Sequence, residues 1–275
     1  MPHLSLRLTM PIVRFLRVFL FLLICAPGLS ASASTSAAAP LTVQVYLPEN
    51  LDVNGQQIPN TPEITEIFSY FERNANLKLK VVTLPWKRAQ IEVLRGNGII
   101  YGFSKSAERL TQYRFSEPVI TLQIWAISYG EENAHFSTLS DLKGKRVTGG
   151  LGMSHGEEYE KARDHVFTVQ ENFLPGRERF KNLMRKYSDL VLVPYRQQLS
   201  RKQVEEIINK EMVSAFNDPA LNGRHFNVSL KPMFYDTIHF ASAKGHFDEV
   251  INRINQTIQS GTKNGSLPKL LQKYQ

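Results

Sequence analysis

The stretch PWKRAQIEVLRGNGIIYGFSKSAERLTQYRFSEPV, residues 85–119, predicts a helix, a buried strand and a second helix start in close succession. Pro85 fits the first turn of the first helix, because its missing N–H needs no partner there, and the GNG at 96–98 ends that helix. The apolar run IIYGF at 99–103 is typical of a strand inside a sheet. Arg109 then follows two serines beyond that strand, so the stretch predicts a sheet with a polar site at its edge.

The same alternation of strands and helices extends toward the N-terminus. The segments LTVQVY, residues 41–46, and LKLKVVTL, residues 77–84, both alternate like strands. Between them, Thr61 is placed as an N-cap and Pro62 as the first helical residue. With the strand at 99–103, these elements give a βαβαβ order, which predicts a parallel sheet covered by helices with right-handed crossovers.

A second α/β unit begins near LQIWAISY, residues 122–129. It contains a helix that we expect to open at Ser154, then a helix that leads into the apolar run DLVLVP at 189–194. A strand, IHFASAK at 238–244, and two helical runs close the chain. Because no linker separates the two units, we expect two lobes that share the chain more than once.

The N-terminal segment differs from the rest of the chain. Three arginines precede or enter the apolar run VFLFLLICAPGL at 18–29, and small residues follow it. This pattern predicts a secretory signal peptide over residues 1–33 and a periplasmic location. The run is shorter than the roughly 20 residues that a membrane span needs. An uncleaved anchor and lipid attachment at Cys25 are the alternatives.

Cys25 is also the only cysteine, so a chain cleaved after it has neither disulfides nor cysteine-based metal sites. The net charge of +8 includes the three signal-peptide arginines, which leaves +5 without them. These charges are spread along the chain without a Lys/Arg block, which argues against nucleic acid as a partner and weakly favours anionic ligands. The histidine spacing fits no metal motif and no phosphate-binding loop is present, so we expect no cofactor.

The order of these features resembles the family 3 extracellular solute-binding proteins, the polar amino-acid type of periplasmic binding protein. The resemblance runs through residues 85–119, then through LSDLKGKRVTGGLGMSHGEEYEKA at 139–162, YSDLVLVPY at 187–195 and INQTIQSGTKNGSLPKLLQKY at 254–274. No single motif is diagnostic, but four of them occur in the family's order. The resemblance implies an α/β fold of the type II periplasmic binding proteins.

In that fold, two lobes with mostly parallel sheets are joined by two crossover strands, and the ligand lies in the cleft between the lobes. The resemblance implies that residues 34–120 and 239–275 form the first lobe, and that residues 121–238 form the second. The crossings would fall near residues 119–123 and 237–242.

The strand at 99–103 ends where an open α/β sheet binds its ligand. Gly102 and Ser104 stand at that end, Ser106 can cap the short helix that follows, and a guanidinium such as that of Arg109 can grip a carboxylate with two hydrogen bonds. In the family the arginine at this place holds the ligand's carboxylate, assisted by the preceding hydroxyl residues. The alternative is that Arg109 merely pairs with a surface carboxylate of this chain.

The second lobe is expected to contribute GLGMSHGEEYE, residues 150–160. Gly152 lets the backbone approach closely, and Ser154 would open a helix whose amides face the cleft and attract an anion. The resemblance places a stacking aromatic near the ligand. Three aromatic residues are candidates for the site, although each also fits the margin of a core: Trp86, Tyr46 and Tyr101.

Two departures from the family concern the ligand's ammonium group. Amino-acid-binding members carry acidic residues at the ends of the first strand and of the strand at 189–194. Here Tyr46 stands at the first place, and Tyr195 and Arg196 stand at the second, so only Glu49 is left nearby as a substitute. We therefore expect either a ligand without an α-amino group, or a larger anion or dicarboxylate bound by Arg196.

The expected function is capture of a small polar, carboxylate-bearing solute by an exported monomer, which delivers it to an inner-membrane ABC permease. One alternative is a binding protein that presents its closed form to a membrane receptor or sensor kinase. An enzyme of the dehydratase type on the same fold is less favoured, because the adjacent pairs Glu157-Glu158 and Glu205-Glu206 point to different helix faces.

Overall fold

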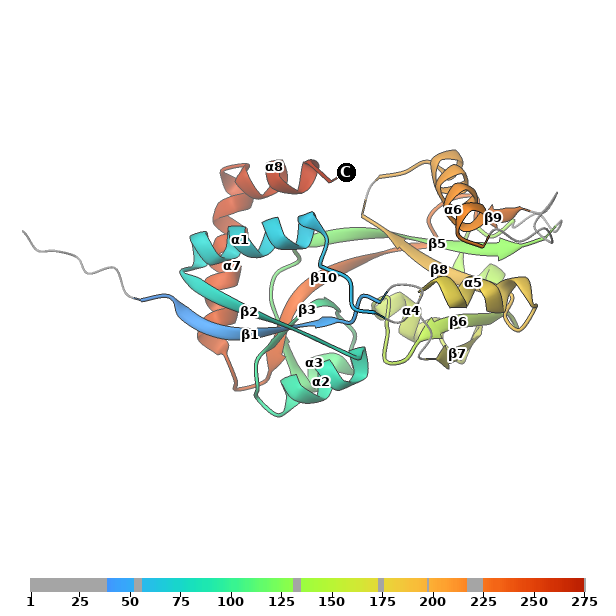
Figure 1. Cartoon of the computed structure of the whole chain (residues 1–275). Coiled ribbons are helices and arrows are strands. Elements are labelled where there is room, and N and C mark those ends of the chain that lie inside the picture. Colours follow the sequence, from blue (N-terminus) through green and yellow to red (C-terminus); the bar gives the residue numbers. More distant parts are fainter. Residues whose placement is uncertain are drawn as a thin grey trace, which may run out of the picture. The chain divides into compact units, whose positions relative to one another are not determined.

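The computed structural model describes residues 39–51, 56–130, 135–172, 176–196, 198–216 and 225–274, and the predicted signal peptide lies outside these residues. Figure 1 shows their arrangement. The strands are β1 (Leu41–Pro48), β2 (Leu77–Leu84), β3 (Ile99–Ser104), β4 (Tyr113–Phe115), β5 (Ile120–Tyr129), β6 (Arg146–Gly150), β7 (Thr168–Asn172), β8 (Leu190–Tyr195), β9 (Phe226–Val228) and β10 (Phe234–Ala243). The α-helices are α1 (Pro62–Ala75), α2 (Trp86–Leu94), α3 (Arg109–Gln112), α4 (Glu157–Ala162), α5 (Gly176–Met184), α6 (Arg201–Phe216), α7 (Asp248–Lys263) and α8 (Ser266–Gln272), and a 3₁₀ turn covers Leu139–Leu142.

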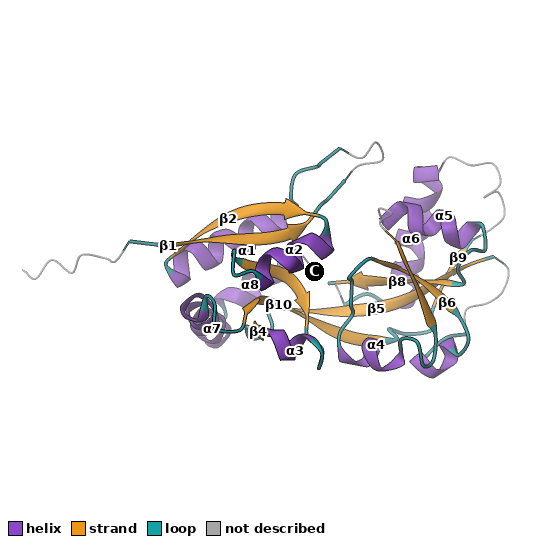
Figure 2. Cartoon of the chain, turned by 90° about the horizontal axis from the view of Figure 1, so that it is seen from below, coloured by secondary structure: helices purple, strands orange, loops and turns teal. Residues whose placement is uncertain are grey.

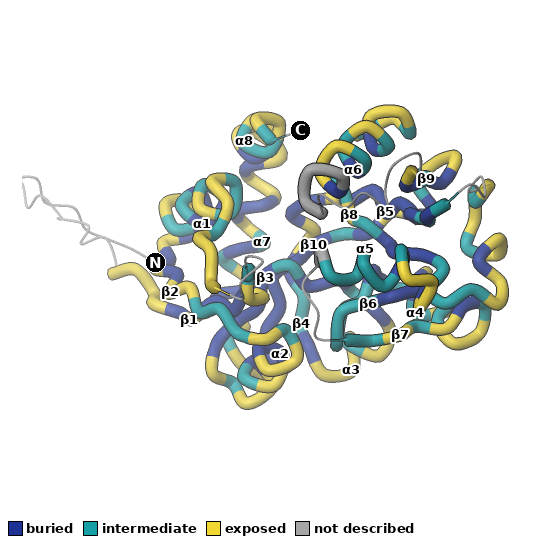
Figure 3. Tube along the Cα trace, turned by 45° about the vertical axis from the view of Figure 1, so that its right-hand side comes forward, coloured by how far each residue is buried: buried dark blue, intermediate teal, exposed yellow. Residues whose placement is uncertain are grey.

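In the first lobe, β1 pairs in parallel with both β2 and β3, as the βαβαβ order predicts. Helices α1, α7 and α8 pack together over one face of these strands, and α2 covers the other face (Figure 1). Val45 of β1 joins the core beneath α1, whereas its neighbour Tyr46 joins the core beneath α2. This alternation follows from the two-residue period of a strand, and both faces are buried at Val45 and Tyr46, whereas other parts of β1 and β2 are exposed (Figure 3).

The ends of α1 explain why the sequence marks this helix so clearly. The Thr61 hydroxyl oxygen accepts a hydrogen bond from the N–H of Ile64, and Pro62 is the first helical residue. Asn76 ends the helix in the left-handed conformation with φ of 49°, in which asparagine is one of the tolerated residues. Start and stop therefore both follow from local side-chain chemistry.

In the second lobe, β6 pairs in parallel with β7 and β8. A separate apolar core gathers Trp125 and Ile127 of β5 with Phe180 of α5 and Val204 and Ile208 of α6. One side of this lobe thus has a core of its own, whereas Val147 of β6 and Leu190 of β8 join the larger apolar cluster that also holds the first-lobe core.

Two long strands connect the lobes. β10 pairs with β3 and β4 of the first lobe, and β5 pairs with β8 of the second. The two strands pair with each other in antiparallel fashion, Ile120–Ile124 against Phe234–Ile238 (Figure 2). The predicted α/β fold with two crossover strands is therefore present, with parallel pairs inside each lobe and antiparallel pairs along the connection. No helix of the described residues is long and apolar enough to cross a bilayer.

Candidate functional site

Arg109 begins α3 just beyond the end of β3, and its guanidinium reaches both lobes. The Cζ atom lies 3.9 Å from the centroid of the Phe103 ring. Nη1 donates a hydrogen bond to the carbonyl of Ser104 at 2.8 Å, and Nη2 donates to the carbonyl of Gly152 in the second lobe at 3.0 Å. The residue therefore lies where the first lobe meets the second.

The Arg109 guanidinium forms no salt bridge with any carboxylate of the described residues. Its two hydrogen bonds go to backbone carbonyls, which carry no net charge. Burial lowers the pKa of Arg109, while the negative charge of Glu160 and Asp236 at longer range raises it. The pairing with a surface carboxylate, which was the alternative from the sequence, is absent within the described part of the chain. An anionic group brought by a ligand would meet a largely desolvated cation.

The N-cap of the short helix that carries Arg109 is Glu108, not Ser106 as predicted, and Ser106 lies two residues before that cap. The Ser106 side chain is 3% exposed, and its hydroxyl oxygen accepts a hydrogen bond from the N–H of Arg109 at 3.3 Å. Gly102 lies on β3 two residues before Ser104 with φ of 87°, a backbone conformation that favours glycine. The Ser106 hydrogen bond and the glycine conformation at position 102 thus set the direction in which the chain leaves β3.

Ser104 links the lobes through its side chain. Its hydroxyl lies 2.6 Å from Oδ2 of Asp236 and 3.1 Å from the carbonyl oxygen of Ser154. Asp236, on β10, is 5% exposed, and its Oδ1 accepts a hydrogen bond from the N–H of Thr237. Burial raises the pKa of Asp236 to about 6, against the opposing effect of these two hydrogen bonds and of Arg109. This carboxylate was not predicted from the sequence, where it is marked only as the single acid of a mostly apolar strand.

The loop after β6 supplies the contacts from the second lobe. Gly152 has φ of 71°, and its carbonyl accepts hydrogen bonds from Arg109 and, at 2.9 Å, from Nε2 of Gln90. A Cβ atom at position 152 would lie 3.0 Å from Nε2 of Gln90 and 3.1 Å from Cδ of Lys87. The backbone at Gly152 therefore lies close to side chains of α2, and its approach to a ligand stays a prediction.

The predicted helix start at Ser154 is wrong. Helix α4 begins at Glu157, and its N-cap is Gly156 with φ of 90°. The Ser154 hydroxyl oxygen instead accepts a hydrogen bond from the N–H of Gly156, so it closes a turn before the helix. Ser154 faces the first lobe through its backbone carbonyl, which lies near the Ser104 hydroxyl.

A cavity of about 490 Å³ opens beside Arg109 between α2, α3 and the loop after β6. Both signs of charge line it, which suits a polar ligand more than an apolar one. Among the lining residues are Lys87, Ser106, Arg109, Gly152, Met153 and Glu160.

The predicted aromatic residues lie at different distances from this cluster. Trp86 is half-buried, and its ring makes an edge contact with the ring of Phe103, with 5.9 Å between the two centroids. The Arg109 guanidinium lies over the same Phe103 ring. The Tyr46 hydroxyl lies 3.5 Å from the carbonyl of Asn97, which precedes β3, and so points away from the end where Ser104 stands. Tyr101 is 1% exposed, and its hydroxyl has no hydrogen-bond partner among the described residues.

Arg196 and Tyr195 lie apart from Arg109. Arg196 forms a salt bridge with Glu63 at the start of α1, and both line a second cavity of about 520 Å³. Tyr195 is half-buried against the core beneath α6, and burial raises the pKa of its hydroxyl. The structure thus brings five predicted residues together and leaves this pair elsewhere. The five are Ser104, Ser106, Arg109, Gly152 and Ser154.

Two further polar residues near the cleft were not predicted. His155 is 9% exposed, and burial together with the charges of Arg179 and Arg109 lowers its pKa to about 4, so the ring is neutral at physiological pH. Arg179 lies on α5 with Nη1 3.8 Å from Sδ of Met153. The sequence indicates only that Arg179 shares a helix face with Leu183, four residues later, which is buried.

Two α/β lobes joined by two crossover strands, with polar residues of both lobes in contact, define a two-lobed binding-protein fold. The chain belongs to the bacterial extracellular solute-binding proteins, family 3, which match residues 63–275. Members of this family are extracellular or periplasmic. A search of curated protein sequences gave no match.

Solved structures show the same fold. The amino acid ABC transporter substrate-binding protein AbpA from Streptococcus pneumoniae, bound to L-arginine, is 18% identical with a TM-score of 0.61, over 85% of this chain and 94% of that one. The GluR0 ligand-binding core from Nostoc punctiforme, in complex with L-glutamate, is 16% identical with a TM-score of 0.57, over 86% and 99%. An ancestral amino acid-binding protein, a precursor of cyclohexadienyl dehydratase, is 17% identical with a TM-score of 0.58, over 85% and 94%. At these identities the likeness concerns the fold alone.

Proposed function

We propose that this protein captures a small carboxylate-bearing solute between its lobes and delivers it, as an exported monomer, to an inner-membrane ABC permease. The observation that carries this proposal is the Arg109 guanidinium, which is largely buried where the lobes meet and has no carboxylate partner among the described residues. A ligand carboxylate would supply that partner through a two-pronged pair. The similarity to an amino acid ABC transporter protein supports the transport role.

The same contacts support closure of the lobes around a ligand. Arg109 and Ser104 of the first lobe each reach a backbone carbonyl of the loop after β6, those of Gly152 and Ser154. A solute held by Arg109 would add contacts that exist only when the lobes meet. A ligand shifts a conformational equilibrium only through such differential contacts.

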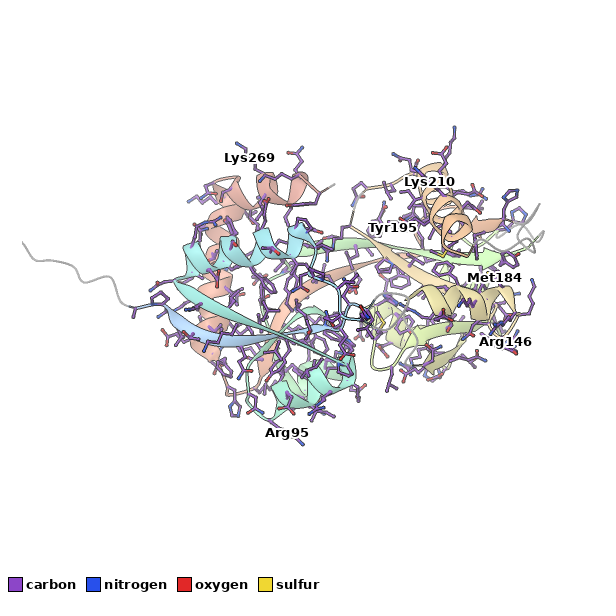
Figure 4. The ribbon with its side chains drawn as sticks, viewed as in Figure 1. Arg95, Arg146, Met184, Tyr195, Lys210 and Lys269 are labelled. Atoms are coloured by element: carbon purple, nitrogen blue, oxygen red, sulfur yellow. The ribbon has the colours of Figure 1, made fainter. Side chains whose placement is uncertain are left out.

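The test is Arg109→Ala, with Arg95→Ala as the matched control. Arg95 caps the end of α2 (Figure 4), its side chain is 65% exposed, and among the described residues its one salt bridge is with Glu92 of the same helix. The ligand is first identified by mass spectrometry of small molecules released from the purified, denatured protein. We expect calorimetry to show a loss in affinity of about 100-fold for Arg109→Ala and no change for Arg95→Ala. Unchanged affinity of Arg109→Ala would contradict the proposal.

A second candidate function is elimination chemistry, which Asp236 favours. A buried carboxylate whose pKa is raised to about 6 can accept a proton near neutral pH, and one structural neighbour is an ancestral precursor of a dehydratase. Incubation with the identified ligand distinguishes the two functions. Quantitative recovery of the unchanged ligand supports binding, whereas turnover that is lost in Asp236→Asn supports the enzyme.

A separate experiment decides whether the ligand-bound, closed protein acts on an ABC permease or on a membrane receptor or sensor kinase. Binding-protein-dependent uptake into vesicles that contain the permease would support transport. Activation of a membrane receptor or sensor kinase by the loaded protein, without uptake, would support the signalling alternative.

A further inference from the structure

Arg179, on α5 of the second lobe, is a second largely buried arginine near the loop after β6, and it has no anionic partner among the described residues. Its Nε atom is buried without a hydrogen bond, and within the described part of the chain its Nη1 atom donates only to the thioether of Met153, a weak acceptor. The neighbouring carboxylate of Glu178 is already paired with Lys181. The side chain therefore carries a charge that its surroundings do not neutralise.

Arg109 and Arg179 both contact the loop after β6. Arg109 donates to the carbonyl of Gly152, and Arg179 contacts the side chain of the next residue, Met153. Both guanidinium groups also lower the pKa of His155, two residues further along, so their charges act on one small region. The neutral His155 ring contributes no negative charge between them.

Two unpaired cations around one loop are unfavourable for the ligand-free protein. Both guanidinium groups are largely buried away from water, and this burial lowers the pKa of each. Like charges in a poorly solvated site also repel each other. Packing does not require this arrangement, because an apolar side chain of similar length would fill the same space. A ligand with negative charge at both ends would satisfy both groups.

We infer that Arg179 binds a second anionic group of the ligand, so that the solute is a small dianion, such as a dicarboxylate, held between Arg109 and Arg179. The inference rests on the proposed function, because Arg109 takes the first carboxylate. It also replaces the role that the sequence assigned to Arg196, whose guanidinium is already paired with Glu63.

The test compares solutes that carry two carboxylates, called dianions for those two groups whether or not an ammonium group is present, with monoamides of the same shape that keep one carboxylate. The probes are L-glutamate, L-aspartate, succinate and glutarate, each beside its monoamide: L-glutamine, L-asparagine, succinamate and glutaramate. Thermal shift identifies the pair that binds best, and calorimetry measures both members. We expect the native protein to prefer the dianion by at least about tenfold, because the distal carboxylate alone can pair with Arg179.

The variant Arg179→Met keeps the length of the apolar stem and removes the charge. We expect it to lose about tenfold or more in affinity for the dianion, while affinity for the monoamide stays within about twofold. Because an unpaired charge is removed, we also expect the unfolding midpoint of the ligand-free variant to equal or exceed that of the native protein. Arg179→Lys, which keeps the charge, should restore part of the preference for the dianion.

Arg146→Met is the matched control from the same lobe. Arg146 is the first residue of β6, at the opposite end from the loop, and it pairs with Asp189 (Figure 4). Its replacement should leave the preference for the dianion unchanged.

The outcomes separate this inference from the proposed function. If the native protein prefers no dianion over its monoamide, or if Arg179→Met keeps the preference, the inference is overturned. If Arg179→Met lowers the unfolding midpoint and weakens both members of a pair equally, Arg179 is structural and the inference is again overturned. If monoamide binding survives Arg109→Ala unchanged, the proposed function fails instead.

Discussion

Asp236 is the buried carboxylate of the cleft, and its surroundings decide its charge. Desolvation is the largest influence and raises its pKa to about 6, although Ser104 and Thr237 donate hydrogen bonds to it and Arg109 lies near. The Asp236 carboxyl therefore binds its proton more tightly in the folded chain than in the unfolded chain. The folded protein loses stability as the pH rises and Asp236 must ionise in place.

This sign leads to a pH-dependent prediction for Asp236→Asn. The amide can keep both hydrogen bonds, because its oxygen accepts from the N–H of Thr237 and its nitrogen donates to the Ser104 hydroxyl. Below about pH 3 the aspartate is protonated in both states and the variant should match the native protein. From there to about pH 7 the variant should gain relative stability, up to about 3 kcal/mol. Urea denaturation across this range measures the difference, and a difference that does not change with pH would refute the raised pKa.

Single residues differ in how far the sequence could place them. Ser104, Ser106 and Arg109 follow one strand within six positions, so local chemistry and the end of a sheet were enough to bring them together. Asp236 lies on β10, more than a hundred residues along the chain from Ser104, and Arg179 lies on α5 of the second lobe. Their positions depend on how the two crossover strands and the second-lobe helix pack, which no short sequence pattern encodes.

At the scale of elements, the start of α4 depends on one glycine. Gly156 is the N-cap with φ of 90° and ψ of −172°, a region almost restricted to glycine. A Cβ atom there would lie 2.6 Å from Oδ1 of Asp236. The helix start and the buried carboxylate therefore fit together only if residue 156 has no side chain.

Gly156→Ala should destabilise the protein more than Gly245→Ala. The control residue also has a positive φ, 77°, but a Cβ atom there meets nothing within 4 Å. We expect on the order of 3–4 kcal/mol for Gly156→Ala, from backbone strain and the clash together, against about 1 kcal/mol for strain alone at Gly245. Chemical denaturation followed by circular dichroism measures both, and equal losses would mean that the contact with Asp236 is unimportant.

The elements themselves were predictable where their ends carry their own chemistry. Helix α1 has a capping threonine, a first-turn proline and a left-handed asparagine, so both ends were marked. Ser154 had the same N-cap chemistry but used its oxygen to close a turn with Gly156, so α4 starts later than the sequence indicated. Strand β7, with the sequence TVQEN, was missed because it pairs at the edge of the sheet and its side chains are only partly buried.

At the scale of the whole molecule, contacts between the lobes lie on more than one side of the connecting strands. Ser104, Gln90 and Arg109 reach the loop after β6. Elsewhere, Glu63 at the start of α1 pairs with Arg196 just after β8, and this is the one salt bridge between the lobes within the described part of the chain. The pair is only partly exposed, with 14% of the Glu63 side chain and 33% of the Arg196 side chain accessible. It therefore favours the arrangement in which the lobes touch.

Glu63→Gln should shift the protein toward a more open state and weaken ligand binding indirectly. Removal of a half-buried ion pair costs about 1 kcal/mol, which corresponds to about a fivefold loss in apparent affinity when binding requires the closed form. Glu66→Gln is the control, because Glu66 lies one turn further along α1 and pairs with Lys273 within the same lobe. Calorimetry with the co-purified ligand should show the loss for Glu63→Gln alone, and small-angle scattering of the ligand-free variant should show a larger radius of gyration. The difference between Glu63→Gln and the native protein should shrink at high salt, because screening weakens the native pair; equal effects of the two substitutions would show that the Glu63–Arg196 pair does not hold the lobes together.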